Sequence, residues 1–488
     1  MQISSREDKH QILVDISKLI EEDILNCNSN VFDKHSKEKI ENDLIKKSIF
    51  KRLNEKFRGD YNFSKELFIN DVNNVASTNN LNISSDRTVL ISLIDEFIKH
   101  KSNKDSSEPS EDYQSFRDYI FNDYRNIADS SQNIYIQAWR RRQIARTSSQ
   151  LHQSMHNKIP HLLGAFELSK GCSVGCWFCA VAAPTLSDIF TYSLQNRDLW
   201  RKVLNLLKTL HGKAAKASFC YWASDPLDNP DYENFCLDFY ELLGVFPQTT
   251  TALAMRNPER TRKLLKLSLE KRCLKNRFSV LSLASLNKIH QEFTPEELAF
   301  VKLELQYKQS NATISNSGRA RDRYAKQKQK NRLVEEKSLP GTIACVSGFL
   351  FNMVDRTVKL ISPYNADDRW PLGYRIFEEG TFENIDDLKV LLEGMIDRHM
   401  PLEIESNDNI KFREDLEYES LSNGFKLFTR FKTYRFTNTP HARYLGEIIY
   451  KNNKTAQEIV DYFKWQNVPS SYIYKDLNLM FDLGLLAD

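Results

Sequence analysis

The chain has 488 residues, of which 41% are hydrophobic and 27% are charged, and its formal net charge is +3. This length is sufficient for two or three domains with sizeable cores. The composition is ordinary for a globular enzyme, and so small a net charge gives no electrostatic reason to expect a nucleic-acid partner.

The amino terminus and the cysteines indicate a compartment. The first ten residues, MQISSREDKH, lack the apolar segment of a secretion signal, and no uncharged run approaches the roughly 20 residues that span a bilayer. Most of the eight cysteines are widely scattered, which does not suggest a disulfide framework. We therefore expect a cytoplasmic protein with no membrane partner.

Residues 1–130 form a charged N-terminal region that we expect to be helical. Apolar residues recur in it at roughly helical spacing, as in Ile12–Ile20. Asn-rich and Ser-rich breaks interrupt the pattern at 26–30, 79–82 and 102–110. No strand-rich α/β pattern punctuated by glycine is found there.

Residues 131–400 have the pattern of an α/β domain. From about residue 160, short apolar segments alternate with helical segments, which is typical of parallel βα units. Leu162–Leu168 is the expected first strand. We expect the later strands at 217–222, at 248–253, at 277–284, and at 303–307 or 312–315.

Two further segments follow this pattern. Residues 349–354 and 358–362 flank a turn and predict an antiparallel hairpin, which we expect to close the mouth of a barrel. Residues 401–488 are expected to form a small winged-helix-like module. In this module Thr455 and Glu458 have the spacing of a capping box, and a second helix is expected at 471–481.

Three cysteines follow the first strand with the spacing C-x3-C-x2-C, namely Cys172, Cys176 and Cys179. A [4Fe-4S] cluster normally takes four thiolates, so a loop with three leaves one iron open to a ligand from a small molecule. The alternatives are plain buried thiols and a zinc knuckle, which would need a fourth Cys or His at short range. The upstream histidines do not have zinc-finger spacing.

The cysteine spacing resembles the radical S-adenosylmethionine (SAM) superfamily. Residues 167–179 (ELSKGCSVGCWFC) and 344–356 (ACVSGFLFNMVDR), followed by Ile361–Pro363 and 368–374, resemble the radical SAM peptide epimerases of proteusin-type ribosomal peptides, the polytheonamide-type family. The resemblance covers roughly residues 130–400. It implies a partial (βα)6 barrel, a [4Fe-4S] cluster with SAM, an external electron donor such as flavodoxin or ferredoxin, and a precursor peptide whose L-residues become D-residues.

Such an epimerase needs a hydrogen donor. The resemblance implies that a 5'-deoxyadenosyl radical removes the Cα hydrogen, after which the substrate radical flattens. A hydrogen atom must then arrive from the opposite face, and a thiol S–H is weak enough to supply it. Cys345 lies in the family-like segment and is the favoured donor, Cys220 is the next candidate, and a purely structural thiol is the alternative.

The resemblance also implies contacts to SAM. Ser224 and Asp225 stand where the superfamily has a Gly-Gly-Glu-like motif for the methionine amino group, although Asp-Pro also favours a turn. The remaining candidates are Phe178 for the adenine, Thr249, Thr250 and Ser282 for the ribose or carboxylate, and Arg319 for the carboxylate. Core packing, ordinary strand positions and a solvated basic segment are the competing interpretations.

Other interpretations fit part of the pattern. The C-terminal module would hold the leader peptide if it adds that peptide to a sheet edge, with strands from Lys426–Phe436, and a helical cap on the barrel is the alternative. A crosslink-forming radical SAM maturase often carries a cysteine-rich C-terminal domain, whereas no cysteine follows Cys345. A non-catalytic binding protein with a structural metal site would not cleave SAM.

Overall fold

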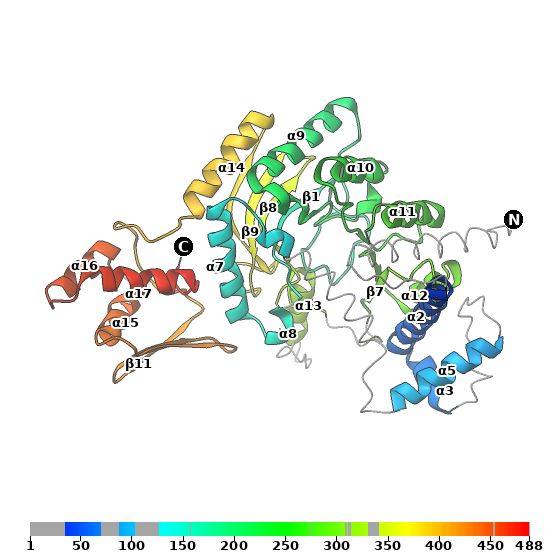
Figure 1. Ribbon diagram of the computed structural model, residues 1–488, viewed down its shortest axis with the longest axis horizontal. Helices are drawn as coiled ribbons and strands as arrows, with labels where there is room; N and C mark the ends of the chain where they lie inside the picture. Colours follow the sequence, from blue (N-terminus) through cyan, green and yellow to red (C-terminus); the bar gives the residue numbers. More distant parts are fainter. Residues whose placement is uncertain are drawn as a thin grey trace.

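The computed structural model shows a mixed α/β protein (Figure 1). It describes residues 35–69, 87–102, 126–156, 158–273, 275–307, 310, 314–329, 341–451 and 454–487. The segment Ile12–Ile20, which we expected to be helical, lies outside these residues. Among the described helices, none combines the length and the apolar composition that crossing a membrane requires.

The largest sheet has the strand order β10-β9-β8-β1-β4. Its strands are β1 Leu162–Glu167, β4 Ser218–Phe219, β8 Val346–Asn352, β9 Thr357–Pro363 and β10 Tyr374–Thr381. β1 pairs in parallel with β4 and β8, whereas β8, β9 and β10 are antiparallel neighbours. The hairpin expected at 349–362 is therefore present, and its first strand lies beside β1 as part of the main sheet.

A second sheet contains three parallel strands, β5 Thr250–Thr251, β6 Arg277–Val280 and β7 Lys302–Leu305. The strands alternate with helices α9 Leu194–His211, α10 Tyr232–Leu243, α11 Pro258–Glu270, α12 Leu283–Glu292 and α13 Gly318–Gln329. The short antiparallel pair β2 Ser169–Lys170 and β3 Asp188–Ile189 flanks the loop that follows β1. The alternation of strands and helices predicted from the sequence is confirmed.

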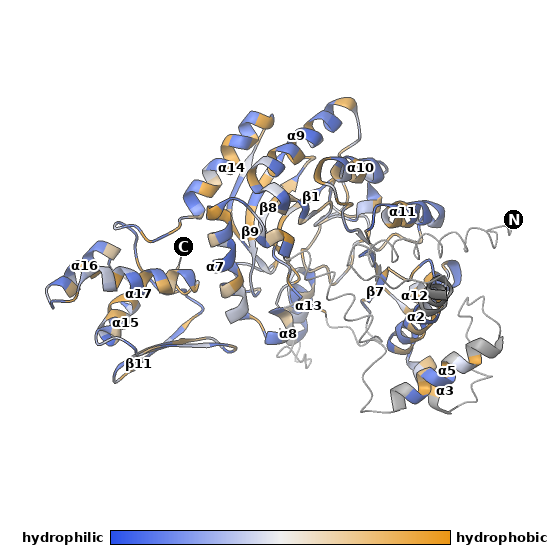
Figure 2. Ribbon diagram, viewed as in Figure 1, coloured by the Kyte–Doolittle hydropathy of each residue, from blue (hydrophilic) through white to orange (hydrophobic). Residues whose placement is uncertain are grey.

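The two faces of the second sheet differ in polarity. In β6 and β7 every second residue is buried, and Phe278, Val280, Leu303 and Leu305 belong to an apolar cluster that includes residues of α12. The residues between them, Arg277, Ser279, Lys302 and Glu304, line a cavity, and Leu303 and Leu305 also contribute to its lining. Figure 2 likewise shows apolar and polar residues alternating around helices such as α9 and α14 (Ile385–His399). One-sided burial of this kind positions each strand in the fold.

Gly348 permits the close pairing of β1 and β8. A Cβ atom at this position would lie 2.1 Å from the carbonyl oxygen of Leu163, closer than any side chain tolerates. Because these two strands carry the segments before and after the cavity, their spacing fixes the geometry of the candidate site.

Several strands are shorter than the sequence predicted. The second strand, expected at 217–222, is confined to Ser218–Phe219. It pairs with β1 on one side only, because β5 pairs with β6 in the second sheet. The fourth, expected at 277–284, ends at Val280, because Ser282 already begins α12 as its N-cap. Of the two segments proposed for the fifth strand, the first is correct, since β7 covers Lys302–Leu305.

The described N-terminal helices are α2 His35–Gly59, α3 Tyr61–Ile69 and α5 Arg87–Ser102, followed by α7 Ile134–Gln150 and α8 Gln153–His156. The helical character predicted for this region is confirmed for these residues. Arg52 attaches α2 to the α/β domain by donating to the carbonyl oxygens of His290 (3.0 Å) and Phe293 (2.6 Å). A buried guanidinium held by two carbonyl groups is an anchor that fixes the position of α2.

The C-terminal module has its own apolar core. Its elements are β11 Glu417–Leu421, β12 Gly424–Phe428, β13 Thr433–Phe436, α15 Ala442–Tyr450, α16 Ala456–Lys464 and α17 Ser470–Asp482. The capping box of Thr455 and Glu458 is confirmed, as is the second helix. The three strands form one antiparallel sheet in the order β11-β12-β13, and all of them precede the helices.

Helix α7 joins the module to the α/β domain. Arg142 donates to the carbonyl oxygen of Pro401 (2.7 Å) and its guanidinium lies 4.1 Å from the ring centre of Phe481. Arg146 donates to the carbonyl oxygen of Leu486 (2.6 Å). Because both arginines are buried, the module is held against α7 by partners that water does not screen.

Candidate functional site

The three clustered cysteines lie in a loop, residues 171–183, that follows the carboxyl end of β1. This cysteine loop turns sharply at Gly171, whose φ is +86° and whose Cβ, if present, would lie 2.4 Å from the carbonyl oxygen of Thr185. The amide of Cys179 donates to the carbonyl oxygen of Cys176 (3.2 Å), and the amide of Ala183 donates to Sγ of Cys179 (3.3 Å). The chain therefore wraps around its own thiols.

Charged residues hold the loop from outside. Asp228 accepts from the amide and the hydroxyl of Ser173, at 2.9 and 2.6 Å. Arg256 donates to the same carboxylate (2.9 Å) and to the Ser173 hydroxyl (2.6 Å). This network restrains the residue that directly follows Cys172.

The start of α13 clasps the other side of the loop. Arg319 donates from its guanidinium to the carbonyl oxygens of Cys176 (2.9 Å) and Ala183, and its amide donates to that of Cys179 (3.0 Å). Gly318 has a φ of +54°, and a Cβ there would lie 2.4 Å from the Cys179 carbonyl oxygen. The guanidinium of Arg319 thus orients the backbone of the cysteine loop, and Arg319 is not among the residues that line the cavity.

Burial keeps the thiols of Cys172 and Cys176 protonated when no cation is bound. It raises the pKa of Cys172, and it raises that of Cys176 to about 11, where the neighbouring thiols Cys179 and Cys172 add to the effect. A bound cation would replace these protons, since a coordinating thiol is deprotonated.

A single metal ion and an iron-sulfur cluster need different arrangements of sulfur atoms. Among the described residues, no group of three or more His, Cys, Asp and Glu side chains is placed to hold one ion. A single zinc ion needs its sulfur ligands about 2.3 Å from one point. A cubane binds each thiolate through a different iron, so it needs sulfurs that stand further apart.

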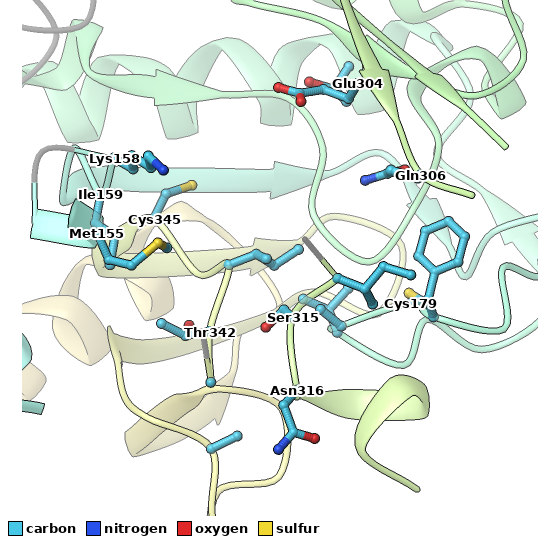
Figure 3. A pocket seen from close by; sticks show the side chains of 18 of the residues that line it. Met155, Lys158, Ile159, Cys179, Glu304, Gln306, Ser315, Asn316, Thr342 and Cys345 are labelled. Carbon is cyan, nitrogen blue, oxygen red and sulfur yellow. The ribbon is translucent and has the colours of Figure 1, made fainter. Parts of the chain in front are cut away.

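A cavity of about 1560 Å³ connects the cysteine loop with the rest of the domain. Pockets for drug-sized ligands have volumes of roughly 300–1,000 Å³, so this cavity has room for more than one small molecule. Cys172, Cys176, Cys179 and Cys345 all line it. Figure 3 shows Cys179 and Cys345 on opposite sides of the cavity.

The strand register explains this separation. Cys345 directly precedes β8, and its carbonyl oxygen accepts from the amide of Leu162 at the start of β1 (2.8 Å). The cysteine loop follows the other end of β1, which has six residues and therefore extends about 20 Å. The fourth thiol and the three clustered thiols enter one cavity from opposite ends of the same strand.

Cys345 is partly buried and carries its proton. Burial raises the pKa of its thiol to about 11, although the positive charge of Arg277 opposes the shift. The S–H bond is therefore intact at neutral pH.

The other described cysteines lie elsewhere. Cys220, the second candidate donor, is buried after β4 and faces Cys236 of α10, and burial raises the pKa of Cys236 well above its ordinary value. Cys273 is also buried, and none of these three lines the cavity. Cys27 lies outside the described residues. This placement favours Cys345 over Cys220.

Phe178, Ser224, Asp225 and Thr250 also line the cavity, as the sequence analysis requires of residues that contact a cofactor. Asp225 is buried and accepts from the Leu227 amide (3.0 Å), the Thr251 hydroxyl (2.6 Å) and the Ala252 amide (2.7 Å). Burial raises the pKa of this carboxyl to about 6 despite these bonds. Asp225 thus caps its own Asp-Pro turn, as the alternative interpretation expected. It also joins the segment after β4 to the end of β5.

Two candidate hydroxyl groups lie outside the cavity. Ser282 accepts from the amide of Ser285 (3.0 Å) and serves as the N-cap of α12. Thr249 is buried and its hydroxyl lies 2.9 Å from the Tyr232 hydroxyl. Neither residue lines the cavity, and the hydroxyl groups of both contact neighbouring helices.

The structure also reveals a polar wall that the sequence analysis missed. Its members are the cavity-lining residues Gln248, Thr250, Arg277, Ser279, Lys302 and Glu304 of β5 to β7 and the residues just before them. The Tyr221 hydroxyl donates to Gln248 (2.6 Å) and lies 2.8 Å from the Thr250 hydroxyl, which ties the wall to the segment after β4. The strict alternation of polar and apolar residues at 277–280 and 302–305 was the available signal.

Comparisons with known proteins find one similarity within the C-terminal module and one over most of the chain. A family profile described as "Protein y4wI C-terminal domain" matches residues 410–465, which include the sheet of the C-terminal module. Over 333 residues, or 68% of its length, the chain is 42% identical to "Uncharacterized protein y4wI" of Sinorhizobium fredii (strain NBRC 101917 / NGR234). The chain covers 64% of the length of that relative. No match is found among solved structures.

Proposed function

We propose that the protein is a radical SAM epimerase that converts L-residues of a ribosomally made precursor peptide into D-residues. One observation carries the proposal: three clustered thiols and one separate thiol line a single cavity from opposite ends. Inversion of a Cα centre needs removal of hydrogen on one face and its return on the other. A cavity with a different reactive group at each end meets this requirement.

The residues present fit the cofactors of such an enzyme. Cys172, Cys176 and Cys179 would hold a [4Fe-4S] cluster, and Phe178 and Ser224, which line the same cavity, would contact SAM. When bound, this pair of cofactors supplies a 5'-deoxyadenosyl radical, for which one electron comes from a carrier such as flavodoxin or ferredoxin. Arg319 and Asp228 keep the loop in shape around its thiols.

Cys345 would complete the inversion. Its S–H bond breaks and a Cα–H bond forms, so the substrate centre receives one hydrogen atom and the sulfur is left as a thiyl radical. One electron from the external carrier and one proton then restore the thiol. The raised pKa of Cys345 supports this role, since a thiolate has no hydrogen atom to give.

The alternation of strands and helices supports a partial (βα)6 barrel as the scaffold, with the cysteine loop after its first strand. The C-terminal module, with three helices and an antiparallel sheet, supports a role as a winged-helix-like element for the leader peptide, although its strands all precede its helices. A cytoplasmic location, where thiols and clusters stay reduced, is part of the proposal.

Anaerobic reconstitution with iron and sulfide tests the chemistry. We expect about four irons for each chain, the EPR signal of a reduced cluster, and 5'-deoxyadenosine from SAM. A variant with Ser at all three loop positions should lose iron and deoxyadenosine together. Co-expression with a precursor peptide encoded beside the gene, in deuterium oxide, should add about one mass unit for each inverted residue.

Two outcomes would contradict the proposal. Stoichiometric zinc with no SAM cleavage would favour a non-catalytic binding protein. A peptide product that loses two hydrogens and contains a new crosslink would favour a different radical SAM maturase.

A further inference from the structure

Most of the exposed residues that line the cavity lie near the end where Cys345 is found, and Arg58 of α2 is a further exposed lining residue. The lining residues of the cysteine loop, from Cys172 to Val181, are buried or only partly exposed. At the other end, Lys158, Ile343, Asn365, Glu417 and Phe431 line the cavity and are exposed, Ile343 to 56%. We call these five residues the amino-end mouth, because they lie around the starts of β1 and β8.

The C-terminal module forms one side of this mouth. The turn between β12 and β13 contributes Thr429, Arg430 and Phe431 to the cavity lining. The hydroxyl of Thr429 donates to the carbonyl oxygen of Ser149 in α7, and the ring of Phe431 packs edge-on against that of His152, with 6.2 Å between the ring centres. The module is therefore built into the mouth.

The sheet of the module leads to the same place. In the order β11-β12-β13, β13 is an edge strand that starts at Thr433, directly after the turn at the mouth. An edge strand offers unpaired amide and carbonyl groups to an extended peptide. Arg430, Lys432 and Arg435 are exposed on the turn and on β13. The charge of this edge fits a peptide with acidic side chains.

The interior beyond the mouth suits a peptide backbone. The polar wall formed by Gln248, Thr250, Arg277, Ser279, Lys302 and Glu304 carries polar groups along the second sheet, some of which pair with one another, as Lys302 does with Glu304 (2.5 Å). An extended polypeptide carries one donor and one acceptor per residue, and each needs a partner when water is excluded. A purely apolar barrel interior would leave these groups unsatisfied.

We propose that the substrate peptide pairs as an extended, acidic segment with the edge of β13 and passes through the amino-end mouth to reach Cys345. The choice of occupant rests on the proposed function. The path places the peptide between the two sets of thiols, with Cys345 on the side from which the peptide arrives. The module that recognises the peptide would thereby also set which residue reaches the reactive position.

Thiol labelling tests the path without SAM, iron or peptide. In the full chain, we expect N-ethylmaleimide to reach Cys345 through the amino-end mouth, as read by mass spectrometry of the peptide that contains it. Ile343→Trp and Glu417→Trp narrow the mouth from two separate elements and should each slow this labelling at least fivefold. Leu194→Trp, at a residue that is 87% exposed and does not line the cavity, is the matched control.

Labelling of Cys345 at the wild-type rate in both mouth variants, with native circular dichroism, would overturn the proposed path. This result would leave the epimerase chemistry standing, because SAM cleavage and iron content do not depend on it. Conversely, slowed labelling in the mouth variants of a protein that does not cleave SAM would support the proposed path and contradict the proposed reaction.

Photo-crosslinking tests the occupant. With p-benzoylphenylalanine at position 431, we expect irradiation to join the chain to a co-expressed, tagged precursor peptide. The same residue at position 465, where the native Trp465 is 90% exposed on the module, should give no crosslink. Failure to crosslink at 431 while the precursor co-purifies, or crosslinking from position 177 of the cysteine loop alone, would refute the proposal.

Discussion

Replacing Arg319 by methionine should loosen the cysteine loop while the domain stays folded. The guanidinium of Arg319 donates to two carbonyl oxygens of the loop, those of Cys176 and Ala183. Methionine retains much of the length and apolar surface of the side chain but donates nothing. The change therefore removes two hydrogen bonds from a charged donor and leaves two carbonyl groups without that partner.

The magnitude follows from the bonds lost. A hydrogen bond from a charged group contributes about 1.5–3 kcal/mol, and the lower value applies here because Arg319 is only partly buried. Two bonds give about 3 kcal/mol, which is roughly a 100-fold increase in the fraction of chains with an open loop. Arg319→Lys keeps the charge but reaches one acceptor at a time, so its effect should be intermediate.

Hydrogen–deuterium exchange measures this opening without any cofactor. The amides of Cys172, Cys179 and Ala183 are bonded within the loop region, so the peptide that contains them should exchange up to about 100-fold faster in Arg319→Met. Arg321→Met is the matched control, since Arg321 lies on the same helix and pairs with the exposed Asp368 (2.7 Å). Wild-type exchange in Arg319→Met, or equal acceleration in the control, would refute the reasoning.

Three further predictions concern the donor thiol, pH and packing. Cys345→Ala should keep 5'-deoxyadenosine formation but abolish deuterium uptake into the peptide, whereas Cys220→Ala should keep both activities. Loss of deuterium uptake in Cys220→Ala alone would make Cys220 the hydrogen donor. Burial lowers the pKa of His211 from 6.5 to about 4, and neither ring nitrogen has a partner among the described residues. Between pH 6.5 and pH 4 the unfolded chain therefore binds a proton at this residue, whereas the folded chain does not. This contribution to stability is complete above pH 6.5 and is lost, by up to about 3 kcal/mol, as the pH falls to about 4; His211→Phe should flatten this slope in urea titrations. Gly348→Ala should lower the free energy of unfolding by at least about 2 kcal/mol because its Cβ would strike the β1 backbone, whereas Gly394→Ala, which meets only the end of the Arg398 side chain at 3.0 Å, should be neutral or stabilising.

Local signals in the sequence predicted local structure well. The capping box of Thr455 and Glu458 depends on residues three positions apart, and β1 follows from one continuous apolar segment. Ser282 shows how a local signal can be misread, because a Ser before a helical run is an N-cap and we extended the preceding strand through it. The sequence contained this information, and the competing strand pattern obscured it.

Contacts between distant segments could not be predicted in the same way. Arg319 meets the carbonyl oxygen of Cys176 across 143 positions of the chain, and nothing near Arg319 indicates that meeting. The length of β4 likewise depends on whether β5 pairs with it, and β5 pairs with β6 instead. Such features are set by the packing of whole elements, which a pattern of single residues does not encode.

The position of Cys345 becomes intelligible when the two ends of a parallel strand are compared. A donor at the carboxyl end of a strand, where Cys220 follows β4, would stand on the same side of the substrate as the cysteine loop and would return hydrogen to the face that lost it. Such a return restores the L-residue. In the proposed reaction, a donor at the amino end of β8 would approach from the other side, so that each return would invert the centre. Reactive groups in parallel βα domains usually lie at the carboxyl ends of strands, and the location of this thiol at the start of a strand therefore supports the proposed inversion.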